Sequence, residues 1–459
     1  MEIKLAIFCL SYKIIDTGGV VMLLKYWIEN YKSFYDRAEF HMQPAPRLQQ
    51  LSYSVQNERA GRKKVRGLCS SVIYGPNAAG KTSFLGALEV LKAIVLEGNI
   101  RDKERITGNF SVNHLKYIPN IRHFMSGDMD IKPVTLGVEA VTDGLLFSYE
   151  ISFRCENLLN SRIDREIVSE SLSVNGKAIY IRKGKHVQFV NKVPAAYRNA
   201  AGNLKGMARL SLQTEPTELF LTGNFKAFYS SSLVSQIKDW FADKLMIIYE
   251  AAFVDIQPNL SALGNNASFG MINDLAKAFG SSANEMVYRT DSDGKLTLCS
   301  EFDFQKKKVL IPAVQYESLG TRRIVSIFPA IAKAFLNGAT LLVDELDASI
   351  HTMAVVSLIN IFHNDEINRN HAQLIFNTQN PIYLNRNIFR TDEIKFVDRN
   401  DETHYSEIYA LSDFGTKGST RAKNTSNYMS NYFVNRYGAI RNIDLSSIFM
   451  KILEESDHK

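Results

Sequence analysis

The sequence predicts an α/β fold with a mixed sheet, in which an antiparallel β block and a mainly helical segment interrupt a parallel core. Three patterns predict it. An apolar run ending at Tyr74 leads into a glycine-bearing loop, and a helical pattern leads out of it. Residues 134–182 alternate apolar and polar side chains around Asp-Gly and Asn-Gly pairs, which is typical of antiparallel hairpins. Residues 339–376 follow the order strand, helix, strand, which predicts parallel strands beside the first run.

The first part of the chain is expected to deliver the glycine-bearing loop. A strand is predicted at residues 23–28, a polar surface excursion at 43–66 and a second strand at 65–74. After Lys81, apolar residues recur every three or four positions, which predicts a helix with one apolar face. These residues are Phe84, Leu85, Leu88, Leu91 and Val95.

The middle of the chain changes pattern twice. Strands at 134–141 and 145–153 flank one predicted hairpin turn, and strands at 171–174 and 177–182 flank the next. Residues 194–279 then carry long apolar stripes, which we interpret as the core faces of helices. No sustained heptad with charged flanks is present, so no long coiled coil is expected.

The last part of the chain returns to an α/β pattern after a further hairpin around Asp293-Gly294. A helix is predicted after Arg323, a buried strand at 339–343, a helix near Ala348 and a strand at 373–376.

We expect one core made of two halves. Residues 22–190 supply the first half with its antiparallel block, residues 286–459 supply the second, and residues 191–285 form a mainly helical insertion. Met22 opens a segment typical of a natural beginning, so residues 1–21 are interpreted as an upstream extension.

The composition is that of a soluble globular protein, with 45% hydrophobic and 22% charged residues. A net charge of +6, with basic runs at 62–66, 306–308 and 421–423, permits contact with nucleic acid without demonstrating it. The four cysteines are far apart and form no metal-ligand spacing, which indicates a reduced, cytoplasmic protein. No apolar run is long enough to span a bilayer, so no membrane partner is expected.

A phosphate-binding pattern, G-x-x-x-x-G-K-[ST], spans residues 75–82. Glycines let backbone N–H groups curl around a phosphate, and the following helix directs its positive end to the same point. Lys81 would reach the outer phosphates, and the Thr82 hydroxyl would bind Mg²⁺. The alternative is a glycine-bearing loop before an ordinary helix, which the strand and helix on either side disfavour. The sequence therefore predicts a nucleotide site.

A second informative stretch is residues 340–347, where a buried strand ends in acidic residues. Nucleotides bind at the carboxyl edge of open α/β sheets, which is where this strand would place its acids. Asp344 would hold Mg²⁺, and Glu345 would orient and polarise the attacking water. Taken alone, the stretch is also compatible with an acidic turn. Lys81 and Asp344 are too far apart in the chain for a compact GTPase or an ordinary ring ATPase, which favours an inserted domain.

Several motifs together resemble those of ABC-type ATPases. They look like the phosphate loop, a degenerate signature, the second acidic motif with its following loop, and the switch. These motifs are Gly75-Pro-Asn-Ala-Ala-Gly-Lys-Thr82, Ser318-Leu-Gly-Thr321, Leu341-Leu-Val-Asp-Glu-Leu-Asp-Ala-Ser349 and Phe376-Asn-Thr-Gln-Asn-Pro381. With Ile28-Glu-Asn-Tyr-Lys-Ser-Phe34 and Asn435-Arg-Tyr-Gly-Ala-Ile440, the chain more closely resembles the AAA15 group of ABC-like ATPases. The resemblance implies a P-loop ABC-type head, similar to the heads of SMC, Rad50 and RecF proteins.

This resemblance implies a dimer of heads that binds ATP and Mg²⁺ between subunits. Ser318, Gly320 and Thr321 of one subunit would contact the γ-phosphate held by Lys81 of another. Further nucleotide contacts would come from the loop and from the start of the chain. These are Asn30, Lys32, Ser33, Gly75, Pro76, Asn77, Ala78, Ala79, Gly80, Thr82, Ser83 and Asp347.

One position departs from the pattern of the group. Its switch residue is commonly histidine, and Gln379 stands there in this chain. Glutamine can still hydrogen-bond a phosphate oxygen or water, but it cannot carry a proton charge. Glu345 and Gln379 are thus the implied catalytic residues, and hydrolysis is expected to be slow or tied to a partner.

The leading hypothesis is an ATP-dependent sensor and scaffold in bacterial anti-phage or abortive-infection defence, similar to the ATPase subunit of PARIS-type systems. Its effector would be a separate protein such as a TOPRIM-type nuclease, and its trigger a phage protein, a DNA end or host damage. Two alternatives stay open: a RecF-like or SMC-like ATPase acting on DNA, and a nucleotide-binding structural subunit with little turnover.

Overall fold

The computed structural model describes most of the chain after residue 20. The predicted extension at 1–21 lies outside the described residues except for Val21, and so do the turn at 293–294, Arg62, Lys306 and the basic run at 421–423. No helix of the described part is long and apolar enough to cross a membrane. The described residues are 21–46, 48–61, 63–101, 132–156, 164–199, 214–248, 267–290, 296–305, 307–414, 427–441, 445–446 and 449–450.

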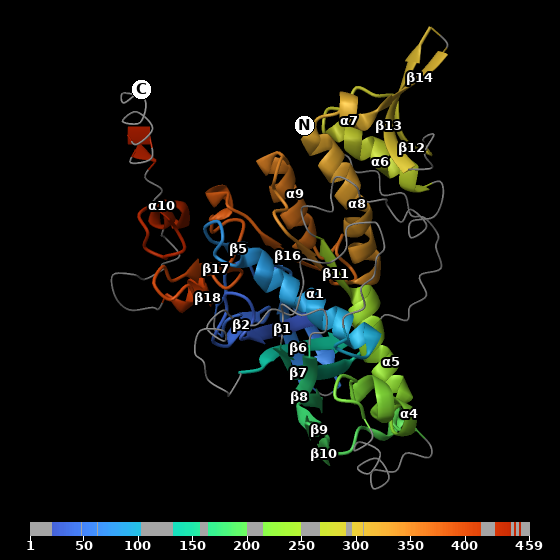
Figure 1. Cartoon of the computed structure of the whole chain (residues 1–459). Helices are drawn as coiled ribbons and strands as arrows, with labels where there is room; N and C mark the ends of the chain where they lie inside the picture. The colour runs from blue at the N-terminus through green and yellow to red at the C-terminus, as the bar shows by residue number, and fades with distance from the viewer. Residues whose placement is uncertain are drawn as a thin grey trace, which may run out of the picture.

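Six described strands form the central sheet, in the order β11-β15-β16-β5-β17-β18 (Figure 1). Neighbouring strands are parallel except for β17 and β18, which are antiparallel. β16 pairs directly with β5, which confirms the parallel pairing predicted beside the strand that delivers the loop. The strands are β5 (Ser70–Tyr74), β11 (Leu245–Ile248), β15 (Thr340–Val343), β16 (Gln373–Asn377), β17 (Ile394–Arg399) and β18 (Ser406–Ala410).

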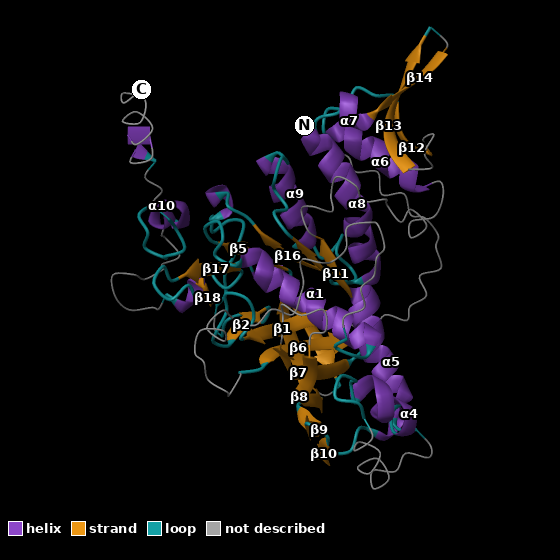
Figure 2. Ribbon diagram, in the orientation of Figure 1, coloured by secondary structure: helices purple, strands orange, loops and turns teal. Residues whose placement is uncertain are grey.

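The inner strands of this sheet are buried on both faces. On one face, Leu342 and Ile375 pack into the core that contains α1 (Lys81–Glu97). On the other, their neighbours Leu341 and Leu374 pack into the core of α8 (Leu319–Asn337) and α9 (Thr352–Phe362). Because successive residues of a strand point to opposite faces, an unbroken apolar run serves both cores. α1 therefore lies between the central sheet and a second sheet (Figure 2).

The second sheet has seven described strands, all antiparallel, in the order β10-β9-β8-β7-β6-β1-β2. The pairs Asp143-Gly144 and Asn175-Gly176 connect its central strands, and all four residues have positive φ angles between 47° and 77°. Both turns therefore have the left-handed geometry that matches the strand twist, which confirms the predicted hairpins. The strands are β1 (Met22–Glu29), β2 (Ala38–His41), β6 (Val134–Thr142), β7 (Leu145–Glu156), β8 (Asp164–Val174), β9 (Lys177–Lys183) and β10 (His186–Phe189).

A short hairpin precedes the phosphate loop. The prediction of one strand over 65–74 is wrong, because β4 (Lys63–Leu68) pairs with β3 (Val55–Ala60) whereas β5 begins at Ser70. At Cys69 the chain leaves its pairing with β3 and begins to pair with β16. Its N–H donates to Ser54 in η1 (Ser52–Ser54), and its carbonyl accepts from Leu374 of β16.

Among the residues that the structure describes, the segment 191–285 contains helical elements and the strand β11, and a further strand begins at Glu285. Trp240 packs edge-on against Phe147 of β7, with ring centroids 5.5 Å apart, so the helical segment around Trp240 packs against the second sheet. β11 lies in the same segment but pairs with β15, which makes it part of the central sheet. The limits of the insertion stay a prediction. The helical elements are η3 (Ala195–Tyr197), η5 (Leu221–Phe225), α4 (Lys226–Phe228), α5 (Ser231–Asp239), η6 (Trp240–Lys244) and α6 (Ala267–Ala278).

A small lobe precedes α8 and projects from the rest of the molecule in Figure 1. It consists of α6 and the antiparallel strands β12 (Glu285–Thr290), β13 (Leu296–Phe304) and β14 (Lys307–Pro312). α7 (Ala313–Tyr316) connects β14 to α8. The remaining short elements are η9 (Pro381–Tyr383), η10 (Leu411–Asp413) and α10 (Tyr428–Phe433).

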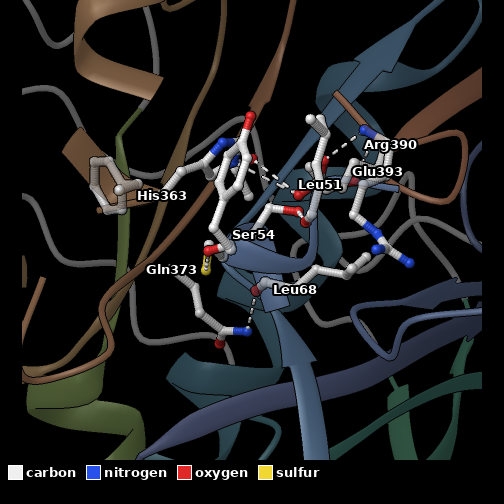
Figure 3. Close-up of polar contacts among 12 residues, drawn as sticks. Leu51, Ser54, Leu68, His363, Gln373, Arg390 and Glu393 are labelled. Carbon is white, nitrogen blue, oxygen red and sulfur yellow. Dashed lines mark hydrogen bonds and ion pairs between the residues drawn. The ribbon is translucent and has the colours of Figure 1, made fainter. Parts of the chain in front are cut away.

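A buried polar cluster joins the first residues of β5 to the segment before β17 (Figure 3). Ser70 Oγ lies 2.6 Å from His363 Nε2, and Glu393 Oε1 lies 3.6 Å from the same nitrogen. Serine hydrolases use opposite ring nitrogens of histidine for the nucleophile and the acid, so this cluster does not have their geometry. Because all three residues are buried, we interpret it as a structural network.

The Gln373 side chain in the central sheet forms hydrogen bonds to β1 of the second sheet and to Leu68. Its Oε1 accepts from the N–H of Leu23 in β1 at 2.7 Å, and its Nε2 donates to the Leu68 carbonyl at 2.9 Å (Figure 3). The side chain is buried with its polar atoms paired, as buried amides require.

Candidate functional site

The loop after β5 turns around two glycines that have no room for a side chain. A Cβ at Gly75 would lie 2.2 Å from the Val397 carbonyl oxygen of β17. Gly80 has a φ of 109°, and a Cβ there would lie 2.7 Å from Ser33 Oγ. Glycine is therefore required at both ends of the loop, because β17 and the segment at Ser33 approach its backbone closely.

Lys81 begins α1 with its side chain folded over the loop. Nζ donates to the Gly75 carbonyl at 2.7 Å and to the Pro76 carbonyl at 3.0 Å. Burial lowers the pKa of Lys81, while the charges of Glu345 and Asp344 act in the opposite direction. The ammonium group thus lies in the field of both acids that follow β15.

Thr82 and Asp344 meet directly, although they are far apart in the chain. Thr82 Oγ1 donates to the two carboxylate oxygens of Asp344 at 3.0 and 3.1 Å. Burial raises the pKa of Asp344, and hydrogen bonds from Asn377 and Thr82 oppose the shift. A hydroxyl and a carboxylate are hard oxygen donors of the kind Mg²⁺ prefers, so this pair fits a magnesium site.

Glu345 adopts a left-handed backbone conformation with a φ of 48°. Its N–H donates to Asn377 Oδ1, and Asn377 Nδ2 donates to Asp344. Gln379 Nε2 donates to Glu345 Oε1 at 3.2 Å. The structure therefore brings both sequence-predicted catalytic residues together beside Asp344.

Asp347 is held by the segment after β16. Thr378 Oγ1 donates to Asp347 Oδ2 at 2.7 Å, and the N–H of Asn380 donates to Thr378 Oγ1 at 2.9 Å. Burial raises the pKa of Asp347, against the effects of the Thr378 hydrogen bond and the Arg323 charge.

The signature-like residues form the start of α8, where Ser318 is exposed, Gly320 is half-buried and Thr321 is buried. Ser318 caps the helix, accepting from the Thr321 N–H at 3.1 Å, and its hydroxyl lies 2.8 Å from Thr321 Oγ1. A Cβ at Gly320 would lie 2.4 Å from the Ser349 carbonyl oxygen, so the helix backbone touches the loop after β15. Ser318 is exposed, and 49% of Leu319 is exposed.

The residues at the start of the chain are divided between two environments. Ser33 lies against the loop at Gly80, and its carbonyl accepts from the Ser406 N–H at 2.8 Å. Asn30 is buried and its amide donates to the Lys132 carbonyl at 2.5 Å, while burial lowers the pKa of Lys32. The structure thus places Ser33 at the phosphate loop, whereas the Asn30 amide bonds to a different segment.

Residues 70–385 match the family described as "AAA domain, putative AbiEii toxin, Type IV TA system". The chain belongs to this family. The match runs from β5 through η9, so it includes the phosphate loop, the acids after β15 and Gln379.

This AAA domain is also similar to solved structures of SMC heads. One is the crystal structure of an Smc head bound to the C-winged helix domain of ScpA, at 14% identity and a TM-score of 0.37, covering 85% of this chain and 98% of that one. Another is an Smc head domain with an extended coiled coil, bound to the C-terminal domain of ScpA, derived from Pyrococcus furiosus. It has 12% identity and a TM-score of 0.38, and the similarity covers 86% of this chain and 97% of that one. A search of curated proteins found no match.

Several residues at the site of this AAA domain were not assigned a role from the sequence. Asn377 bridges the two acids, and its place as the last residue of a buried parallel strand could have indicated this. Ser406 Oγ donates to the Ala79 carbonyl at 2.6 Å, and Arg399 donates to the Ala78 carbonyl at 3.3 Å. Neither of these last two lies in a recognisable motif.

Proposed function

We propose that the chain is an ABC-type ATPase that binds ATP with Mg²⁺ and hydrolyses it. The observation that carries the proposal is the contact of the Thr82 hydroxyl with the Asp344 carboxylate at 3.0 Å. Thr82 and Asp344 would hold the metal, which supplies charge stabilisation at the phosphates when bound. Backbone N–H groups of residues 77–83 would surround the phosphates, and Lys81 would exchange the loop carbonyls for the outer phosphates.

Hydrolysis would depend on Glu345 and Gln379. The Glu345 carboxylate would orient the attacking water and polarise it. Gln379 would hold that carboxylate through its 3.2 Å hydrogen bond, but its amide cannot take a proton. We therefore expect slow turnover that a partner can accelerate.

A second subunit would complete the site. Ser318, Gly320 and Thr321 of one head would face the γ-phosphate bound by another, with Asp347 near the same interface. The exposure of Ser318 and Leu319 at the start of α8 supports this arrangement. The protein would then be a homo-oligomer, at least a head-to-head dimer, that ATP closes and hydrolysis opens.

The biological role we propose is bacterial anti-phage defence. The chain would act as sensor and scaffold for a separate effector, such as a TOPRIM-type nuclease, as in PARIS-type systems, with a phage protein as trigger. The family description, which names a toxin and a type IV toxin–antitoxin system, supports a role of this class. Phage protection of host cells that Lys81→Ala abolishes would agree with it, and protection that survives Lys81→Ala would contradict it.

An alternative role as a RecF-like or SMC-like ATPase on DNA is favoured by the net charge of +6 and by three exposed basic side chains on β4, Lys63, Lys64 and Arg66. DNA binding of this kind weakens steeply with salt, because phosphate contacts release counterions. DNA-stimulated ATPase with a steep salt slope would favour this role over defence.

The ATPase proposal is tested with wild type, Lys81→Ala and Glu345→Gln, with Lys333→Met as a surface control on α8. Lys81→Ala should lose nucleotide binding and turnover together, because it removes the cation at the phosphates. Glu345→Gln should retain binding and accumulate an ATP-bound assembly, because only the water-activating group is changed. Nucleotide binding by wild type with negligible turnover, no faster than in Glu345→Gln, would instead indicate a nucleotide-binding structural subunit.

A further inference from the structure

Glu345 has a backbone conformation that its neighbours must maintain. A non-glycine residue at a φ of 48° is strained, and such residues persist where surrounding contacts determine them. Among the described residues, Asn377 accepts from the Glu345 N–H, and Gln379 donates to its carboxylate. Its carbonyl accepts from the Arg323 guanidinium and from the Ala348 N–H of the same loop, the latter at 3.1 Å. The first two come from β16 and the segment after it, whereas Arg323 comes from α8.

Arg323 is a buried cation within the acidic part of the site. It lies in the second turn of α8, five residues after the Ser318 cap. Its charge also acts to lower the pKa of Asp347, two residues beyond Glu345. A buried guanidinium requires hydrogen-bond acceptors, and the Glu345 carbonyl is one of them.

The backbone of α8 touches the same loop at a second point. The Ser349 carbonyl comes so close to Gly320 that a Cβ would lie 2.4 Å from it, and Ser349 is itself left-handed with a φ of 63°. The start of α8 and residues 344–349 are therefore packed as one unit, with contacts at Glu345 and at Ser349. A shift of the helix start changes the support of Glu345.

We propose that Arg323 is a positioning residue for Glu345. By holding the Glu345 carbonyl, it fixes the orientation from which the carboxylate reaches Gln379. The start of α8 thereby belongs to the hydrolytic site of its own subunit, in addition to presenting Ser318 to another. This inference rests on the proposed role of Glu345 in hydrolysis.

A double-mutant cycle on the full chain tests the proposal. ATP turnover is measured for wild type, Arg323→Met, Glu345→Gln and the double variant. Variants with slow turnover are measured in single-turnover experiments with enzyme in excess over ATP. Arg323→Met should lower kcat by roughly 10- to 100-fold while KM and the stoichiometry of ATP binding stay unchanged, because misplacing a reacting group costs rate and not binding. In the Glu345→Gln background, Arg323→Met should cause no further loss of kcat, because Arg323 acts on the rate through Glu345.

The controls separate positioning from folding. Lys333→Met removes a cation from the same helix away from the site and should leave kcat unchanged. Arg323→Lys keeps the charge and a donor, and should recover part of the rate lost in Arg323→Met. An unchanged kcat for both Arg323 variants, or an equal loss in both backgrounds, would overturn this inference while leaving the role of Glu345 intact. A Glu345→Gln variant with the wild-type rate would overturn both.

Discussion

Burial shifts the pKa values of His363 and Glu393, which lie beside one another. Burial lowers the pKa of His363 to about 4 and raises the pKa of Glu393 well above its usual value. The His363 side chain is therefore neutral in the folded protein near neutral pH, and the folded state favours the protonated form of Glu393 more than the unfolded state does. The neutral imidazole can accept from or donate to Ser70 Oγ at 2.6 Å, and the Glu393 carboxyl accepts from the Arg390 N–H at 2.7 Å. These contacts connect the start of β5 to the segment before β17.

Replacement of His363 by glutamine should change how stability depends on pH. The unfolded histidine takes up a proton near pH 6.5, whereas the folded one does so only near pH 4. The unfolded state therefore binds more protons between these values, and the His363 contribution to the free energy of unfolding is lost as pH falls from 6.5 to 4. Glu393 acts in the opposite sense, because its raised pKa favours the folded state below the unfolded value of 4.5.

Urea unfolding at pH 5, 6 and 7 measures this prediction. The stability of wild type relative to His363→Gln should rise with pH by up to about 1.4 kcal/mol per pH unit. Stability curves of the two proteins that run parallel across this range would show that His363 is not buried in the neutral form.

At the scale of elements, local turn signals predicted the structure well, whereas the sequence did not show which strands pair. The Asp143-Gly144 and Asn175-Gly176 turns need left-handed backbone at two successive residues, so the hairpins follow from the sequence itself. The strand expected at 65–74 divides at Cys69, because β4 and β5 belong to different sheets. Composition cannot show which partner each half takes.

Glu317 joins the small lobe to the start of α8, and its removal should loosen that lobe. Its Oε1 accepts from Ser281 at 2.8 Å and from Ser300 of β13 at 2.7 Å. Glu317→Ala should cost about 1–3 kcal/mol of local stability, because the buried Ser300 loses a charged acceptor.

Amide hydrogen exchange of β12, β13 and β14 measures this loss of local stability, because exchange reports local opening. Glu285→Ala, an exposed acid on β12, is the matched control and should leave exchange unchanged. Equal protection of β13 in Glu317→Ala and wild type would show that these hydrogen bonds do not hold the lobe.

At the scale of the whole molecule, the sequence predicted the fold class and which residues would meet, but not how they are held. The α/β fold with a parallel central sheet follows from the motifs and the strand order around them. Thr82 and Asp344 meet as their motifs require. The supports at Asn377 and Arg323 come from elements packed beside the loop, and a single sequence does not show which side chains tertiary packing brings there. The roles of the site residues stay predictions.

Ser318→Arg tests whether two copies of the molecule complete one site. A bulky cation at the exposed start of α8 should obstruct the face that would meet a second head, yet leave ATP binding at Lys81 unchanged. ATP-dependent association, measured by sedimentation, and turnover should both fall at least about tenfold, as expected when an essential group is misplaced. Ser235→Arg, on the exposed side of α5, should change neither. Unaltered association and turnover in Ser318→Arg would contradict the shared site.

The strand order of the central sheet also bears on how the chain folds during synthesis. β5 lies between β16 and β17, so both of its neighbours come from the last quarter of the chain. At translation rates of about 5–20 residues per second, a ribosome needs roughly 15–60 s to make the residues between β5 and β16. During that interval the phosphate-loop strand has neither edge paired, and exposed apolar strands invite aggregation. We therefore expect this strand to be shielded during synthesis, by chaperones or by α1 and the second sheet, before the nucleotide site forms.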